Sequence, residues 1–113
     1  MIKTLTKTIK YSVVLNYTLN NFDKRRNMIV HHGVIGSCKN FKNITKHHEI
    51  SDYVNSYLID CRNHGQSPHT ASNKISDLAD DLHEFIIHNE LDKNKGLTLM
   101  GHSMGAMALM AFT

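Results

Sequence analysis

Residues 97–112 read LTLMGHSMGAMALMAF: an apolar run, a Gly-x-Ser-x-Gly pentapeptide, and a series of small and apolar residues. The four residues Leu97 to Met100 are apolar or tolerant of β-structure and show no polar alternation, which predicts a strand covered on both faces. The residues after the pentapeptide are helix formers. The stretch therefore predicts a strand, a sharp turn with Ser103 at its corner, and a helix.

Ser103 is a candidate nucleophile. A serine at such a corner is held in a strained backbone conformation that exposes its hydroxyl, and Gly101 and Gly105 let the strand and the helix approach without Cβ clashes. The dipole of the following helix favours an oxyanion formed at its start. The alternative is an ordinary tight turn whose hydroxyl caps the helix. The strand before the turn and the helix after it favour the nucleophile.

A second apolar run, residues 28–30, leads into a turn that contains Gly33 and Gly36. These glycines let the backbone bend so that its amide groups face outward. We expect those amides to face Ser103 in the fold.

Polar side chains near these turns have two interpretations, structural and chemical. An imidazole at the end of a buried strand usually bonds the backbone, so we favour a structural role for His31 and His32 over a catalytic or metal-binding one. Asp60 and Arg62 are likewise predicted to hold the loop that they begin. The adjacent histidines at 47–48 are predicted to lie on the surface.

The rest of the chain alternates between strand and helix, which implies a parallel sheet. We expect a strand within Tyr11–Leu19, a short amphipathic helix over 40–48, a strand over 57–60 and a polar loop over 61–69. The apolar face of the 40–48 helix is predicted to carry Phe41, Ile44 and His48.

A longer helix is predicted to run from an N-cap at Ser72 or Asn73 through Ile86, with an apolar stripe at steps of three and four. Its other face carries four acidic residues: Asp77, Asp80, Asp81 and Glu84. Their crowding could indicate a metal cluster, but we favour a solvated face near the helix N-terminus.

Composition excludes several classes of protein. The 113 residues are 41% hydrophobic and 20% charged, as in a small globular domain, and no apolar run approaches the roughly 18 residues of a membrane span. The net charge of +3 arises in the first 30 residues, and the rest of the chain is close to neutral. We therefore expect no nucleic-acid partner. Cys38 and Cys61 are predicted to be reduced thiols. We expect an intracellular protein, with cytoplasm and mitochondrion left open.

Three ordered motifs carry a resemblance to a known family. They are HGVIGS with NF at residues 32–41, DCRNHGQSPH at 60–69, and GHSMG at 101–105. Together they resemble the α/β-hydrolase superfamily and, within it, esterases of the abhydrolase domain-containing protein eleven type. The resemblance covers residues 12–113 and leaves 1–11 as an N-terminal extension. It implies an α/β fold with a mostly parallel sheet flanked by helices, corresponding to the N-terminal part of a family member without its C-terminal strands.

The resemblance also implies a role for each matched residue. Ser103 attacks an ester or thioester carbonyl and forms an acyl-enzyme, and the backbone N–H groups of Val34 and Met104 form the oxyanion hole. The supporting residues are His32, Gly33, Gly101, His102 and Gly105. His102 is a structural neighbour of the nucleophile, not its base. The implied substrate is a small acyl ester or a lipid, and no cofactor or metal is implied.

The sequence departs from the family pattern in one respect. The α/β-hydrolase order is Ser, then Asp or Glu, then His, yet all nine histidines precede Ser103. The chain is therefore either part of a serine hydrolase whose acid and base lie outside this sequence, or a non-catalytic remnant that binds a partner or nothing. By itself it is expected to hydrolyse esters barely above background. It is also expected to be poorly soluble, because one edge of the strand at 97–100 is left open.

Overall fold

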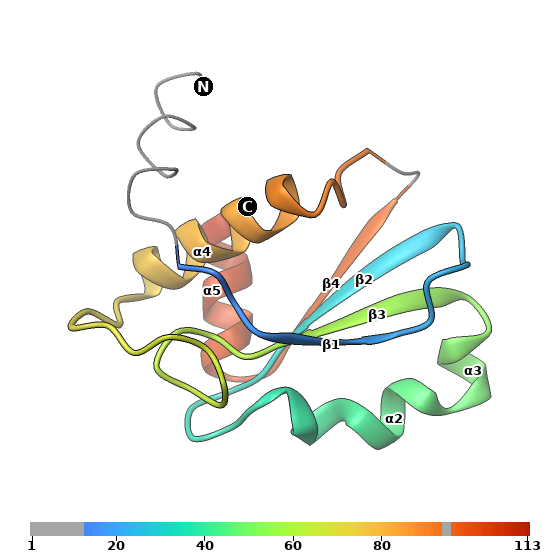
Figure 1. Ribbon diagram of the computed structural model, residues 1–113, viewed down its shortest axis with the longest axis horizontal. Helices are drawn as coiled ribbons and strands as arrows, with labels where there is room; N and C mark the ends of the chain where they lie inside the picture. The colour runs from blue at the N-terminus through green and yellow to red at the C-terminus, as the bar shows by residue number, and fades with distance from the viewer. Residues whose placement is uncertain (1–12, 94–95) are drawn as a thin grey trace.

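The chain folds around a four-stranded sheet whose strands lie in the order β1-β3-β2-β4 (Figure 1). The computed structural model describes residues 13–93 and 96–113. Its strands are β1 (Tyr17–Asn20), β2 (Arg26–His31), β3 (Val54–Ile59) and β4 (Leu97–Gly101). β2 pairs in parallel with both β3 and β4, whereas β1 pairs antiparallel with β3. The predicted mostly parallel sheet is confirmed.

Helices cover both faces of this sheet (Figure 1). On one face lie α4 (Ile75–His88) and α5 (Met104–Phe112), and on the other lie the 3-10 helix η1 (Cys38–Phe41) and the short helices α2 (Lys42–Lys46) and α3 (His48–Ser51). Adjacent residues of β2 pack on opposite faces of the sheet. Ile29 belongs to the core cluster that includes Leu82 of α4, and Val30 belongs to the cluster that includes Cys38. Coverage of both faces explains the continuous apolar runs in the central strands.

β4 and the helix after it form as predicted, but the strand is less buried than expected. Its apolar residues are only half-buried. The reason is its place in the sheet, because β4 is the last strand in the order and pairs with β2 alone among the strands of the described residues. The edge opposite β2 therefore has no ladder partner in this part of the chain.

The strand predicted within Tyr11–Leu19 is shorter in the structure, where β1 begins at Tyr17. Asn16 is already bound elsewhere, since its N–H donates to Ser67 Oγ (2.8 Å) and its Nδ2 to Asp60 Oδ2 (2.9 Å). The extension predicted at 1–11 lies outside the described residues. β3 is longer than predicted, because the polar Asn55 and Ser56 are buried within it.

The amphipathic helix predicted over 40–48 is wrong in its length and its buried face. The segment is divided among η1, α2 and α3, and the extended backbone of His47 (φ −62°, ψ 136°) ends α2. Thr45 is buried, whereas Ile44 is exposed. The Thr45 hydroxyl donates to the Phe41 carbonyl oxygen (2.8 Å), so it needs no contact with water.

The long helix α4 forms, but it begins at Ile75, after the predicted caps. Asp77 turns back to accept hydrogen bonds from the Lys74 N–H (3.0 Å) and the Ser72 hydroxyl. The predicted apolar stripe is confirmed, since Leu78, Leu82, Phe85 and Ile86 are all buried.

Cys38 and Cys61 are buried free thiols, as predicted. Within residues 13–93 and 96–113, no helix combines the length and the apolar character that crossing a membrane requires.

Candidate active site

Ser103 lies at the corner between β4 and α5, in an uncommon backbone conformation (φ 54°, ψ −114°). Its side chain is exposed. Neighbouring backbone atoms approach Gly101 and Gly105 so closely that neither position has room for a side chain. A Cβ on Gly105 would lie 2.2 Å from the His31 carbonyl oxygen, and a Cβ on Gly101 would lie 2.7 Å from the Ala106 nitrogen. Ser103 is therefore solvent-exposed at this turn, as the pentapeptide predicts.

The turn after β2 lies directly beside this corner. β2 and β4 are parallel neighbours with His31 opposite Gly101, and the His102 N–H donates to the His31 carbonyl oxygen (3.1 Å). A Cβ on Gly33 would lie 3.3 Å from Ser103 Cβ. The carboxyl ends of the two strands thus bring both turns to one edge of the sheet, where α/β folds form their ligand sites.

A pocket of about 350 Å³ lies between these turns. Its lining residues are Gly33, Val34, Ile35, Gly36, Asn40, Phe41, His102 and Ser103. Two of the predicted oxyanion-hole and nucleophile residues, Val34 and Ser103, therefore share one pocket. Met104 is the first residue of α5, and the first amides of a helix have no acceptor within it. Its N–H therefore lies at the same corner as Ser103.

His32 holds the turn after β2 and is fully engaged. The residue is buried, its Nδ1 lies 2.7 Å from the Gly33 carbonyl oxygen, and its Nε2 accepts from the Cys61 N–H (3.1 Å). Because Nε2 accepts, this network assigns the proton to Nδ1, which donates to Gly33. Burial lowers the pKa of His32, which keeps the ring neutral. In this arrangement neither ring nitrogen can take a proton from Ser103.

His31 and His102, which flank this corner, differ in burial. His31 is buried, and its Nδ1 lies 3.0 Å from the His32 carbonyl oxygen. Burial lowers the pKa of His31 to about 4. His102 is exposed, with its ring centroid 6.3 Å from that of Phe41. Among residues 13–93 and 96–113, no histidine ring forms a hydrogen bond with Ser103 Oγ.

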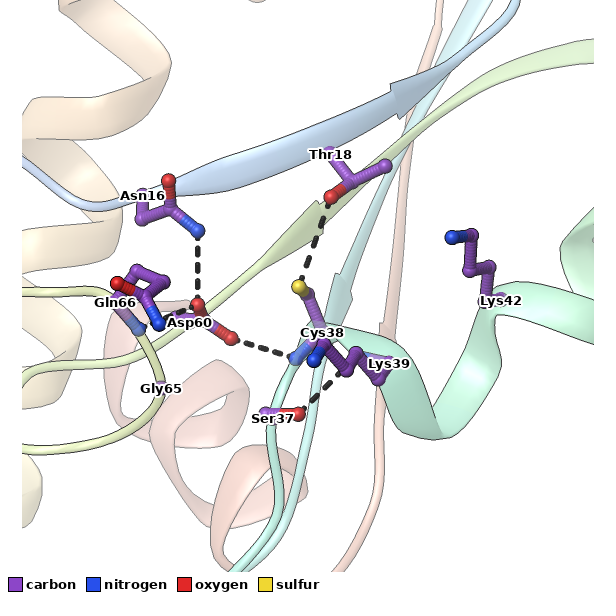
Figure 2. Close-up of a pocket in the computed structure, with 9 residues that line it drawn as sticks. All are labelled: Asn16, Thr18, Ser37, Cys38, Lys39, Lys42, Asp60, Gly65 and Gln66. Carbon is purple, nitrogen blue, oxygen red and sulfur yellow. Dashed lines mark hydrogen bonds between the residues drawn. The ribbon is translucent and has the colours of Figure 1, made fainter.

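Asp60 anchors both the turn after β2 and the loop after β3 (Figure 2). Its carboxylate accepts from the Cys38 N–H (2.6 Å), the Gln66 N–H (2.9 Å) and Asn16 Nδ2 (2.9 Å). Burial alone would raise the pKa of Asp60, but these hydrogen bonds bring it below its ordinary value. The side chain sits at one side of a second pocket of about 280 Å³ (Figure 2). The predicted structural role of Asp60 is confirmed.

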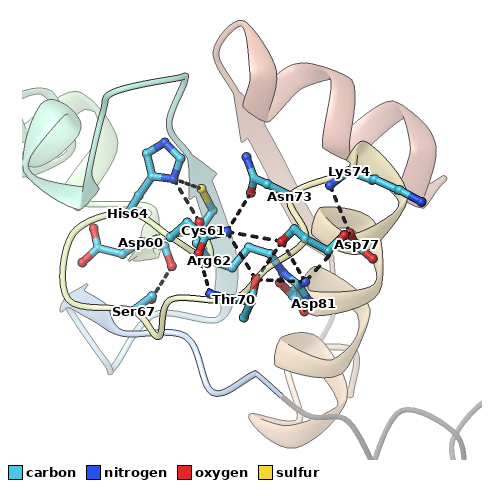
Figure 3. A network of polar contacts seen from close by, with 12 residues as sticks. Asp60, Cys61, Arg62, His64, Ser67, Thr70, Asn73, Lys74, Asp77 and Asp81 are labelled. Carbon is cyan, nitrogen blue, oxygen red and sulfur yellow. Dashed lines mark hydrogen bonds and ion pairs between the residues drawn. The ribbon is translucent and has the colours of Figure 1, made fainter.

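Arg62 ties the same loop to α4 (Figure 3). Its guanidinium donates to both carboxylate oxygens of Asp81 (2.6 and 2.7 Å), and it also reaches the Thr70 hydroxyl (3.4 Å). The prediction that Asp81 lies on a solvated face is therefore wrong, because a buried arginine needs a buried partner. Burial raises the pKa of Asp81 despite these hydrogen bonds.

Two further observations were not anticipated from the sequence. His47, His48 and Glu49 carry possible metal-ligand atoms within 4.8 Å of one another, although all three are exposed and lie outside both pockets. In the turn after β2, the left-handed residue is Ile35 (φ 64°), not one of the glycines to which we assigned the bend. The one signal in the sequence was the spacing of Gly33 and Gly36, because the two residues between them can be the central residues of a β-turn.

The similarity to known proteins extends over the residues of this site. Residues 23–113 match the family model described as serine aminopeptidase, S33. The chain is 30% identical to a "Probable alcohol acetyltransferase" of Saccharomyces cerevisiae over 105 residues, which are 90% of this chain and 31% of that protein. It is 33% identical over 99 residues to "Esterase YbfF" of Escherichia coli, covering 85% of this chain and 36% of that protein.

Solved structures give the same fold. A "Marine microorganism esterase" superposes with a TM-score of 0.80 at 38% identity, over 90% of this chain and 37% of that one. A "Lipase-esterase related protein" of Clostridium acetobutylicum superposes with a TM-score of 0.76 at 28% identity, over 87% of this chain and 40% of that one. The chain thus spans about a third of the length of the curated relatives named above.

Proposed function

This chain belongs to the α/β-hydrolase family described as serine aminopeptidase, S33, and from that premise we propose that Ser103 is the nucleophile of a serine esterase. The observation that carries the proposal is the corner itself. An exposed serine with φ 54° and ψ −114° stands between a strand and a helix, in a pocket shared with Val34. The implied substrate is a carboxylic ester, a thioester or a lipid acyl ester.

In the proposed reaction, Ser103 Oγ forms a bond to the carbonyl carbon and the carbonyl electron pair moves to its oxygen. The backbone N–H groups of Met104 and Val34 donate to that oxyanion, and backbone donors leave the side chains free to vary. Collapse of the intermediate breaks the bond to the alcohol or thiol and leaves an acyl-enzyme. Water or an alcohol then accepts the acyl group.

The proton of Ser103 must go to a base and then to the leaving group. His32 is excluded because both of its nitrogens are engaged, and His31 is buried with a pKa of about 4. Since the family order puts the acid and the histidine after the serine, we assign both to sequence outside these 113 residues. We therefore propose that the chain by itself is inactive.

Transfer of the acyl group to an alcohol is a second candidate function. The specific observation is the 30% identity to a protein named "Probable alcohol acetyltransferase" over 90% of this chain. Both reactions share the acyl-enzyme and differ in the acceptor. A non-catalytic remnant is the remaining alternative.

A fluorophosphonate probe on the full-length protein tests the nucleophile. We expect labelling and ester turnover that Ser103→Ala lowers by about 10³-fold or more, while Ser76→Ala on the exposed surface of α4 changes neither. Labelling that survives Ser103→Ala would sink the assignment. Adding ethanol to the turnover assay separates the two enzyme reactions, because alcohol transfer yields an ethyl ester in place of the free acid.

The 113-residue chain provides the complementary test. Without a base, Ser103 has the reactivity of an ordinary alcohol, so hydrolysis of p-nitrophenyl acetate is expected close to background. A Ser103-dependent turnover of about 1 per second or faster would mean that the chain supplies its own base.

A further inference from the structure

The turn after β2 contains a residue that local rules disfavour. The Gly36 N–H donates to the Gly33 carbonyl oxygen (3.1 Å), so Val34 and Ile35 are the two central residues of a β-turn. Ile35 has a φ of 64°, while Val34 is not among the residues with positive φ. That is the type II pattern, whose second central position favours glycine or asparagine. Ile35 is instead β-branched, which makes this conformation costly.

The other left-handed residues do not share this problem. Asn21 and Asn63 are of the type that tolerates positive φ, Glu90 follows the end of α4, and Ser103 belongs to the elbow. Ile35 is also 92% exposed, so burial of its side chain does not offset the strain. A strained, exposed apolar residue indicates a function outside folding.

The position of Ile35 suggests what that function is. Ile35 lines the pocket that contains Ser103, together with Val34, which is 62% exposed, and the ring of Phe41. These three residues supply apolar side chains at the pocket. Because the Val34 N–H is proposed to bind the carbonyl oxygen, the neighbouring residue Ile35 lies close to the groups attached to that carbonyl carbon.

We infer that Ile35 determines acyl-chain specificity, packing against the chain of an apolar acyl group bound at Ser103. This inference rests on the proposed function of Ser103, and it selects esters of longer apolar acids over acetates. Its physical basis is the burial of Ile35 and of the acyl chain against one another.

The test compares p-nitrophenyl octanoate with p-nitrophenyl acetate on the full-length protein. Ile35→Asn introduces a residue that suits positive φ and removes the apolar surface, so we expect the octanoate/acetate ratio of kcat/KM to fall about tenfold. Ile44→Asn is the matched control, because Ile44 is a 51% exposed isoleucine of α2 outside the pocket. An unchanged ratio with Ile35→Asn, or an equal fall with Ile44→Asn, overturns the inference.

Two further measurements separate this inference from its premise. Binding of dansylundecanoic acid to the Ser103→Ala protein needs no catalysis, and we expect Ile35→Asn to weaken it about tenfold; absence of saturable binding overturns the inference even if Ser103 is the nucleophile. The melting temperature of Ile35→Asn should rise, by about 4 °C, because strain is released. A fall would instead assign Ile35 a structural role and overturn the inference.

Discussion

The turn after β4 and the turn after β2 each hold one non-glycine residue in the left-handed region, but they do so by different means. Ser103 (φ 54°) is held by backbone packing, since Gly105 lies against the carbonyl groups of His31 and His32. Ile35 (φ 64°) lies in a turn whose neighbours are held by hydrogen bonds to His32 and Asp60. The first turn should therefore respond to added volume, and the second to the loss of a hydrogen-bond acceptor.

Gly105→Ala tests the packed turn, and here we expect the largest effect. The added Cβ would lie 2.2 Å from the His31 carbonyl oxygen and 2.7 Å from that of His32, so α5 would have to shift. Alanine normally stabilises a helix relative to glycine by about 1 kcal/mol. We expect the opposite sign, a loss of about 3 kcal/mol or more in the free energy of unfolding, measured by urea denaturation of the full-length protein.

The control for this change is Ala111→Gly, on the exposed face of α5. It should cost only the helix-propensity difference of about 1 kcal/mol. If Gly105→Ala is as stable as the wild type, close packing does not hold the turn at Ser103.

Asp60→Asn tests the hydrogen-bonded turn. An amide cannot accept at both positions of the carboxylate, and its N–H₂ group would face the Cys38 or Gln66 amide. We expect a loss of about 2–3 kcal/mol in the free energy of unfolding. Asp52→Asn, at an exposed position after α3, should change it little. Equal stability of the two variants would contradict the anchoring role of Asp60.

Acid should destabilise the fold at the carboxyl ends of β2 and β4, where both turns lie. The pKa of His31 falls from 6.5 to about 4 on folding, so between these values the unfolded chain takes up a proton and the folded chain does not. Stability from this group is complete above pH 6.5 and is lost as pH falls, by about 2 kcal/mol between pH 7 and pH 5. The lowered pKa of His32 acts in the same direction.

Urea unfolding at pH 7 and pH 5 measures this loss. His31→Gln should reduce the difference between the two pH values, while His47→Gln, at an exposed position, should retain it. A His31→Gln protein with the wild-type pH dependence would rule out the buried imidazole as its source. Asp60 does not contribute in this range, because its pKa lies below the ordinary value of 3.8 and its contribution is lost only at lower pH.

The sequence predicted the strands, the parallel sheet and the serine corner because local rules and tertiary structure agree there. It failed where a distant partner decides the outcome. Asp81 is buried because Arg62 reaches it from another loop. The error at Ile44 has a local cause, because α2 ends after one turn and Thr45 is the residue that is buried. Ile35 was missed for the opposite reason, since its conformation contradicts its own local preference.

Asn40→Ala is expected to have the smallest effect on the free energy of unfolding. It tests whether local hydrogen bonds hold the turn after β2. Asn40 Oδ1 accepts from the Ser37 N–H (2.7 Å), while Ser37 Oγ accepts from the Lys39 N–H (3.3 Å). Asn40 is exposed, so water can replace part of this contact, and we expect a loss of about 1 kcal/mol. Asn43→Ala, at an exposed position of α2, is the control and should change stability by less than about 0.5 kcal/mol. Hydrogen exchange at the Ser37 amide should accelerate in the first variant only. If Asn40→Ala lowers the free energy of unfolding more than Asp60→Asn does, the turn after β2 is held by its own cap and not by the buried carboxylate. The turn after β2 would then differ from the packed turn at Ser103 through local hydrogen bonds alone.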